Sequence, residues 1–107
     1  MKKLIAVVFA LFTSSFADAY ILSPQECYQG ADITARAALE RDKGVPREAL
    51  VTQTEARKKQ YSDEALYEIV LGIVAIVYDM PELNPLQHGQ RFLDECVRTK
   101  GAMNKNV

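Results

Sequence analysis

The chain has few side chains suited to chemistry, and its two cysteines are the most informative. A bridge between Cys27 and Cys96 would close a loop of about 70 residues, which the chain-entropy model values at about 4 kcal/mol. The sequence has no C-x-x-C pair, so a thioredoxin-like oxidoreductase is not favoured. We therefore expect one intramolecular disulfide, with two free thiols or an intermolecular bridge as the alternatives.

The only histidine, His88, stands beside Gln87 and Gln90. A metal site needs several convergent ligands, and the sequence has neither an H-x-x-x-H nor an H-E-x-x-H spacing. It also lacks a G-x-S-x-G elbow, and its five glycines are scattered singly rather than gathered in a phosphate-binding loop. We expect a neutral or solvated His88 without a functional role, and a protein that is not an enzyme and has no metal or cofactor.

The first 19 residues have the pattern of a cleaved secretory signal peptide. Two lysines follow Met1, a nine-residue apolar core spans residues 4–12, and Ala17 and Ala19 supply the small residues that signal peptidase requires. Cleavage is expected after Ala19, with a cut after Ala17 as the alternative. An uncleaved anchor is disfavoured because nine residues are too few to cross about 30 Å of hydrocarbon. The signal would send both cysteines to an oxidising compartment, the periplasm or the exterior.

Cleavage would leave a small domain with little net charge. It retains 88 of the 107 residues, with 11 of the 13 basic and 13 of the 14 acidic side chains, a net charge of about −2. This balance argues against nucleic acid as a partner, because duplex binding needs a concentrated positive surface. The sequence predicts one α-helical domain over residues 20–101 and a flexible polar tail over residues 102–107.

Caps and apolar periodicity predict four helices, separated by Gly44, by residues 61–64 and by residues 80–84. Two capping boxes begin the first and last of them, at residues 23–26 and 84–87. The first helix has a broad apolar, alanine-rich face that includes Cys27, Tyr28 and Leu39. The last has a face formed by Leu86, Leu93, Cys96 and Val97, with Phe92 at its edge. The expected bounds are about 24–43, 46–60, from the cap at 62–64 to 79, and from the cap at 84 to 100.

Residues 65–78 are expected to form the central helix. Twelve of these fourteen residues are apolar, and only Glu68 and Gly72 interrupt them. A buried strand is the alternative for such a run, but its length and the cap before it favour a helix. A transmembrane span is disfavoured because about 20 residues are usually needed.

The connections suggest how the helices are arranged. Gly44 suits a left-handed helix end, and Asp42 is expected to be satisfied by backbone N–H groups of the next helix or by Arg47. Short connections favour an up-down-up-down arrangement, which brings Cys27 and Cys96 to the same end. The sequence therefore predicts an all-α, four-helix, bundle-like domain with one disulfide, and an orthogonal packing of the helices, which would also allow the bridge, is the alternative.

Several short motifs resemble those of a protein family. The pattern consists of Cys27, Ala35-Arg36, Arg41-Asp42-Lys43-Gly44, Val77-Tyr78 followed by Pro81 and Pro85, and Cys96. It resembles small exported proteobacterial proteins of uncharacterised function that have four short helices. The family usually has a capping Ser or Thr after the glycine, where this chain has Pro46. The resemblance implies no catalytic residue.

The resulting functional hypothesis is an exported, non-enzymatic protein that binds another protein. The segment 46–60 has few apolar residues and would leave part of the central helix uncovered, so the expected binding surface is Leu71, Ile76, Tyr78 and Phe92. A second copy of the chain is an alternative occupant. An acid-stress chaperone, an immunity protein of a secreted effector, and a carrier of a small apolar ligand beside Tyr78 and Phe92 are the alternative functions.

Overall fold

A computed structural model of the chain describes residues 20–103, and for Met103 it describes the backbone alone. The expected signal peptide and residues 104–107 lie outside this range. The described part contains four α-helices, as predicted, with one 3₁₀ turn and two very short strands. In chain order they are β1 (Tyr20–Ile21), α2 (Pro24–Asp42), α3 (Arg47–Ala56), η1 (Lys58–Gln60), α4 (Glu64–Asp79), α5 (Pro85–Arg98) and β2 (Ala102–Met103).

The helix starts follow the local sequence closely. Ser23 and Glu26 form a capping box at the start of α2, and Asn84 and Gln87 form another at the start of α5. Asp63 caps α4 by accepting a hydrogen bond from the backbone N–H of Ala65 at 2.7 Å. Each side-chain oxygen satisfies an N–H that has no partner within its helix. These caps confirm where the helices were predicted to begin.

The second helix is shorter than expected. It was predicted to continue to residue 60, but α3 ends at Ala56 and the chain tightens into η1. The side chains from Glu55 to Gln60 are all exposed, so no tertiary packing supports another turn of α-helix there. Only Leu50 and Thr54 of α3 are buried. This agrees with the small number of apolar residues in the segment, which predicted that the helix would pack through a narrow strip.

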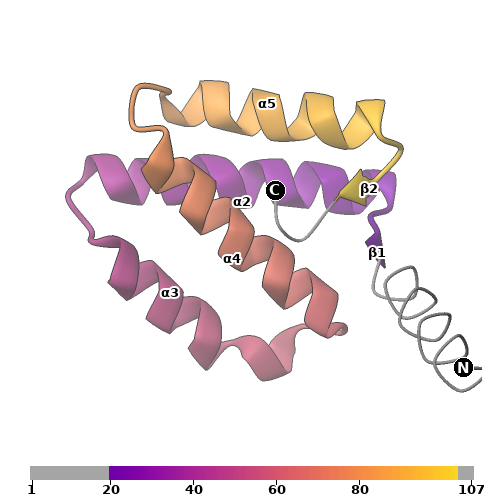
Figure 1. Ribbon diagram of the computed structural model, residues 1–107, viewed down its shortest axis with the longest axis horizontal. Helices are drawn as coiled ribbons and strands as arrows, with labels where there is room; N and C mark the ends of the chain where they lie inside the picture. Colours follow the sequence, from indigo (N-terminus) through magenta and orange to yellow (C-terminus); the bar gives the residue numbers. More distant parts are fainter. Residues whose placement is uncertain (1–19, 104–107) are drawn as a thin grey trace, which may run out of the picture.

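The helices form two antiparallel pairs that cross. The extensive contact between α2 and α5 forms one pair, and α3 packs against α4 to form the other (Figure 1). In this view α4 passes obliquely across α2. The helix α3 lies beside α4, on the side away from α5. The core between them contains Ala38, Val77 and Cys96, none of which is exposed to solvent. The prediction of a bundle-like, four-helix domain is confirmed, although the two pairs are oblique.

Small residues allow α2 and α5 to approach closely, as the alanine-rich face of the first helix predicted. A Cβ atom added to Gly30 would lie 2.4 Å from the ring of Phe92, and one added to Gly89 would lie 3.2 Å from the carbonyl oxygen of Ala31. Real Cβ atoms do not tolerate the first distance, so the Phe92 ring occupies the space of the missing side chain. The two backbones therefore pack nearer than larger residues would permit.

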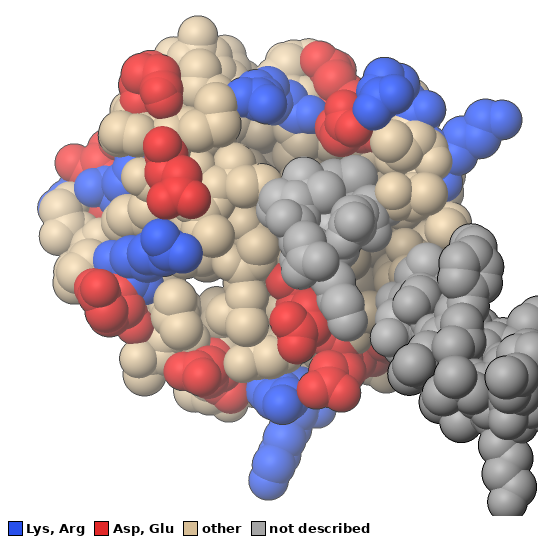
Figure 2. Space-filling view, viewed as in Figure 1, with Lys and Arg blue, Asp and Glu red and all other residues tan. Residues whose placement is uncertain are grey.

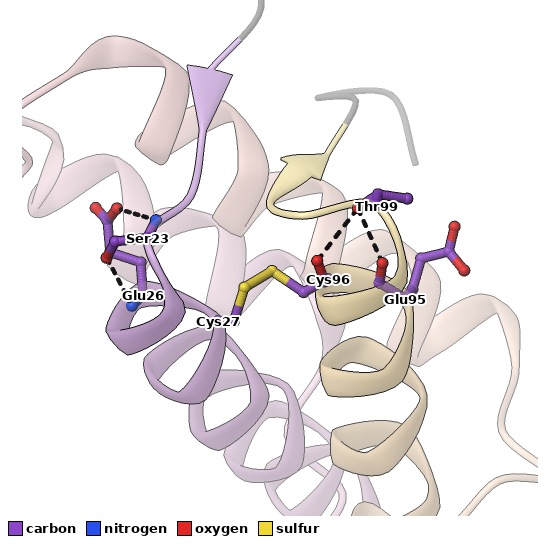
Figure 3. Close-up of a disulfide and its surroundings, with 6 residues drawn as sticks. All are labelled: Ser23, Glu26, Cys27, Glu95, Cys96 and Thr99. Carbon is purple, nitrogen blue, oxygen red and sulfur yellow. Dashed lines mark hydrogen bonds between the residues drawn. A yellow bond between two sulfur atoms is a disulfide. The ribbon is translucent and has the colours of Figure 1, made fainter.

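The expected disulfide joins this pair of helices at one end. Cys27 in α2 bonds to Cys96 in α5, with the two Cα atoms 5.8 Å apart. Figure 3 shows the bridge between the two helices, one turn after the Ser23 cap and one turn before the hydroxyl of Thr99, which donates to the carbonyl oxygens of Glu95 and Cys96. Both cysteines are buried. The bridge therefore fixes the ends that the up-down-up-down arrangement brings together.

The chain just after α5 pairs with the chain just before α2. Residues Ala102–Met103 lie antiparallel to Tyr20–Ile21, and the Leu22 N–H donates to the Gly101 carbonyl at 2.8 Å. Gly101 has a φ of +84°, and an added Cβ would lie 2.0 Å from the Leu22 oxygen, so only glycine fits there. The tail was expected to have no partner from residue 102 onwards. Its first two residues instead pair with β1 and, like the disulfide, hold the start of α2 beside the end of α5.

Candidate functional site

A buried guanidinium group connects the two motifs that carry the family resemblance. Only 8% of the Arg41 side chain is exposed. Its Nη1 donates to the carbonyl oxygens of Val77 at 2.7 Å and Met80 at 3.2 Å, and its Nη2 donates to that of Leu83 at 2.8 Å. Arg41 therefore caps the end of α4 and holds the turn that leads into α5.

Pro81 explains why α4 needs this external cap. In an α-helix the carbonyl of Val77 would accept the N–H of residue 81, but proline has no N–H. The Arg41 guanidinium, which comes from the last turn of α2, donates to that carbonyl instead. A planar group with five donors suits such a divergent set of acceptors.

His88 is one of the most deeply buried side chains, with 2% of its surface exposed. Its Nε2 lies 3.0 Å from the Met80 oxygen and 3.3 Å from Arg41 Nη1. Nε2 can donate to the Met80 carbonyl or accept from the Arg41 guanidinium, but it cannot do both, because a carbonyl only accepts hydrogen bonds and a guanidinium only donates them. His88 is therefore buried rather than solvated, and from the first turn of α5 it contacts the connection that Arg41 holds.

Asp42 has a different partner from either expected one. Its Oδ1 accepts hydrogen bonds from Arg41 Nε at 3.1 Å and Nη2 at 2.8 Å, whereas Arg47 forms an exposed ion pair with Asp79. The expectation was wrong because the neighbouring guanidinium turns back over Asp42 on its way to the turn after α4. Gly44 was predicted correctly: its φ is +93°, and it lies just beyond the C-cap Lys43.

A groove lies between α4 and α5, and His88 is one of the residues that line it. It has a volume of about 290 Å³. Its walls are the side chains of Ile73, Ile76 and Phe92, and its remaining lining residues are Thr34, His88, Arg91 and Glu95. Ile76 and Phe92 are half-buried, so they are held by the fold and are still accessible. The groove therefore offers apolar surface with charged groups at its edge.

The two charged groups at this edge differ in their partners. Glu95 accepts hydrogen bonds from Arg98, which hold the pKa of the Glu95 carboxyl below its ordinary value. Arg91 Nη1 donates to the Met80 sulfur at 3.4 Å, and among residues 20–103 it has no ion pair. Thioether sulfur is a weak acceptor, so the positive charge of Arg91 is left available.

The four residues expected to form a binding surface do not all meet. The structure brings Ile76 and Phe92 together in this groove. Tyr78 instead donates its hydroxyl to the Val45 carbonyl at 2.5 Å, which ties α4 to the loop between α2 and α3. Leu71 lies two helical turns before Tyr78, on the same side of α4 and away from Ile76. All four side chains are half-buried.

Arg91 and Glu95 were not predicted as groove residues from the sequence, although a signal for them exists. His88, Arg91 and Glu95 are spaced three and four residues apart in α5, so they lie along one side of the helix beside Phe92. Their side of the helix could have been identified from this spacing. The neighbouring contribution from α4 depends on the crossing of the two helix pairs, which no local pattern specifies.

A second groove reflects the thin cover that α3 provides. It has a volume of about 220 Å³ and lies between α2 and α3, with Val70 and Val74 of α4 among its lining residues. Both valines are buried, so little of the apolar surface of α4 is accessible there.

The described residues contain no group of three or more His, Cys, Asp or Glu side chains placed to hold a metal ion. No helix within residues 20–103 is both long and apolar enough to cross a membrane. Charges of both signs are interspersed on the face shown in Figure 2, and no concentrated positive area is visible there. The molecule described here is a four-helix domain with a single disulfide and an apolar groove beside α5.

Comparison with known proteins adds no relative. No protein-family model, curated protein or solved structure matches the chain.

Two acidic side chains give a prediction about pH. The pKa of Glu26 is lowered, chiefly by the hydrogen bond from the Ser23 N–H, and that of Glu95 is lowered by Arg98. A carboxyl with a lowered pKa in the folded state stabilises the fold above its unfolded pKa, and this stabilisation is lost as pH falls through the folded value. We expect the thermal midpoint to fall modestly below about pH 4.5, because both groups are solvent-screened.

The change Glu26→Gln tests this prediction, because glutamine can keep the capping-box geometry without titrating. The variant should lose less stability than the wild type when thermal unfolding is followed at pH 6 and at pH 3. An equal loss in the two proteins would show that Glu26 does not contribute to the acid sensitivity.

Proposed function

We propose that this chain is an exported, non-enzymatic protein that binds another protein through the groove between α4 and α5. The observation that carries the proposal is the groove itself, in which the half-buried side chains of Ile76 and Phe92 are accessible beside the buried Ile73, on a scaffold fixed by a disulfide. Accessible apolar surface bordered by polar groups is typical of binding sites. The disulfide is compatible with export.

The size of the groove favours a protein partner over a small-molecule cargo. Pockets for drug-sized ligands occupy about 300–1,000 Å³ and bury most of the ligand. The groove, at about 290 Å³, lies at the lower limit of this range, and two of its walls, Ile76 and Phe92, are half-exposed, so a small molecule bound there would stay partly in solvent. It suits one or two apolar side chains presented from another surface.

The edge of the groove indicates what should stand next to those side chains. Glu95 is already paired with Arg98, whereas Arg91 donates a hydrogen bond only to the Met80 sulfur and has a weaker electrostatic interaction with Glu95. A carboxylate on the partner would therefore find a free guanidinium, and such charge-assisted pairs are directional and strong. The proposed partner segment is an exposed apolar side chain with an Asp or Glu beside it.

Affinity capture from the cell envelope, followed by mass spectrometry, tests this proposal. The wild-type protein should retain a stoichiometric partner, and both Ile76→Glu and Arg91→Glu should reduce its recovery at least tenfold. Lys59→Glu is the matched control, because Lys59 is exposed on η1 away from the groove. Its recovery should equal that of the wild type.

Three results would contradict the proposal. One is the absence of a stoichiometric partner, and another is a partner that both groove variants retain. The third is a small apolar compound that co-purifies with the native protein and is lost in Ile76→Glu, which would make the chain a carrier.

A further inference from the structure

Met80 lies at the end of α4, beside the charged edge of the groove. It is the C-cap residue of this helix, and its N–H donates to the Ile76 carbonyl at 3.0 Å. Its own carbonyl accepts a hydrogen bond from Arg41 Nη1 at 3.2 Å, so the main chain of Met80 is fixed on both sides. The residue as a whole is half-buried. A small solute in water can therefore reach a side chain that is held at one place in the fold.

The sulfur of Met80 is the hydrogen-bond acceptor that Arg91 uses. Arg91 is exposed, and its Nη1 donates to Sδ at 3.4 Å. A thioether is a weak acceptor, so this contact leaves the guanidinium charge available to a partner. Oxidation to a sulfoxide would place a polar oxygen, a much stronger acceptor, on the same sulfur. The chemical state of this sulfur therefore decides whether the edge of the groove carries a free positive charge.

The oxidation of Met80 by a peroxide has a simple balance. A lone pair of the sulfur attacks one oxygen of hydrogen peroxide, so that a sulfur–oxygen bond forms while the oxygen–oxygen bond breaks. The other oxygen departs as hydroxide and takes the proton of the transferred oxygen, which gives one sulfoxide and one water. The sulfur loses two electrons, and the peroxide gains them.

The position of Arg91 favours this step. Negative charge develops on the departing oxygen in the transition state, and a cation fixed beside the reacting atoms stabilises such charge. A guanidinium has five N–H donors, and the contact with Sδ at 3.4 Å uses one of them. Arg91 can therefore donate to the departing oxygen while the sulfur reacts.

We propose that Met80 is an oxidation site that regulates the groove between α4 and α5, an inference that rests on the proposed function. The reduced protein presents the free charge of Arg91 to an acidic side chain of the partner. In the oxidised protein the sulfoxide oxygen accepts the hydrogen bond from Arg91, and the partner's carboxylate loses its charge-assisted contact. Methionine sulfoxide reductases restore the thioether, so the change is reversible.

Peptide mass spectrometry of the exported protein treated with hydrogen peroxide tests the chemical step. Met80 should gain one oxygen atom, and Arg91→Gln should slow this reaction at least threefold, because a neutral amide stabilises the departing oxygen less. Arg36→Gln is the matched control, since Arg36 lies on α2 and its side chain is 77% exposed. Its rate should equal that of the wild type. An equal or faster reaction in Arg91→Gln would overturn the proposal.

Capture from the cell envelope tests the consequence for the groove. Peroxide treatment of the wild type should reduce recovery of the partner at least fivefold, and methionine sulfoxide reductase should restore it. The variant Met80→Leu conserves the volume of the side chain but cannot be oxidised there, so its recovery should not change on treatment. Unchanged recovery from the oxidised wild type, or an equal loss from Met80→Leu, would overturn the regulatory role.

The two measurements separate this inference from the proposed function. If the untreated protein retains no partner, the proposed function fails and the regulatory role fails with it, whereas the effect of Arg91 on the oxidation of Met80 is still measured by peptide mass. If the untreated and the oxidised proteins retain the partner equally, the regulatory role alone is wrong.

Discussion

Replacing Arg41 with methionine should lower the free energy of unfolding by about 3 kcal/mol, the upper end of the cost of leaving a buried polar group without its hydrogen-bond partner. The Arg41 guanidinium donates to three main-chain carbonyls from the end of α4 and the following turn. Methionine fills much of the same space but has no donor. The carbonyl of Val77 would then be left unpaired, because Pro81 has no N–H to offer.

The matched control for this change is Arg36→Met, the same substitution in the same helix. Arg36 is 77% exposed in its side chain and pairs only with Asp32, so the change should cost less than about 1 kcal/mol. Urea unfolding of both variants, followed by circular dichroism, measures the difference. Equal destabilisation by the two substitutions would show that Arg41 does not hold the turn after α4.

Removing the disulfide with the double change Cys27→Ala and Cys96→Ala should cost about 4 kcal/mol. The bridge joins residues separated by 69 positions, and closing so long a loop strongly restricts the unfolded chain. Small domains are typically stable by about 5–15 kcal/mol, so the variant should be partly unfolded at 37 °C. Comparison of the urea midpoints of the variant and the oxidised wild type checks this.

Chemical reduction of the wild type provides the control, because it breaks the same bond without changing the sequence. The reduced protein and the double variant should have similar unfolding curves. If both retain the midpoint of the oxidised protein, the bridge contributes little and the helices are held by their packing alone.

The helices were predictable because their signals are local. The boxes begun by Ser23 and Asn84, the cap residue Asp63 and the left-handed Gly44 each act within a few residues of their own position. The pairing of Cys27 with Cys96 was also predictable, since two cysteines allow one intramolecular connection. The end of α3 was not, because a basic, exposed segment can form an α-helix or a 3₁₀ turn with little difference in energy.

The function of Arg41 was not predictable from its neighbours. Its acceptors Val77, Met80 and Leu83 are 36 to 42 residues away, so only the folded chain brings them into range. No local sequence pattern indicates that the motif around Arg41 contacts the motif around Val77 and Pro81. Their contact gives both a structural explanation: one supplies the donors that the other lacks.

The candidate sites were only partly predictable for a related reason. Sequence periodicity placed Tyr28, Leu39, Leu86 and Val97 on apolar faces, and the structure leaves these four exposed because α2 and α5 cover each other only along their seam. The groove beside α5 depends on the oblique crossing of α4. Ile76 and Phe92 were anticipated as binding residues, whereas the free charge of Arg91 required knowledge of every neighbour.

The most direct test of the proposed groove is site-specific photo-crosslinking in living cells. A photoreactive phenylalanine analogue at position 76 would stand on the groove wall, and the same analogue at position 59 would stand on the exposed η1 turn. We predict that position 76 crosslinks to one envelope protein and that the added Arg91→Glu change abolishes the product. A product of equal yield from position 59, or none from position 76, would contradict the account.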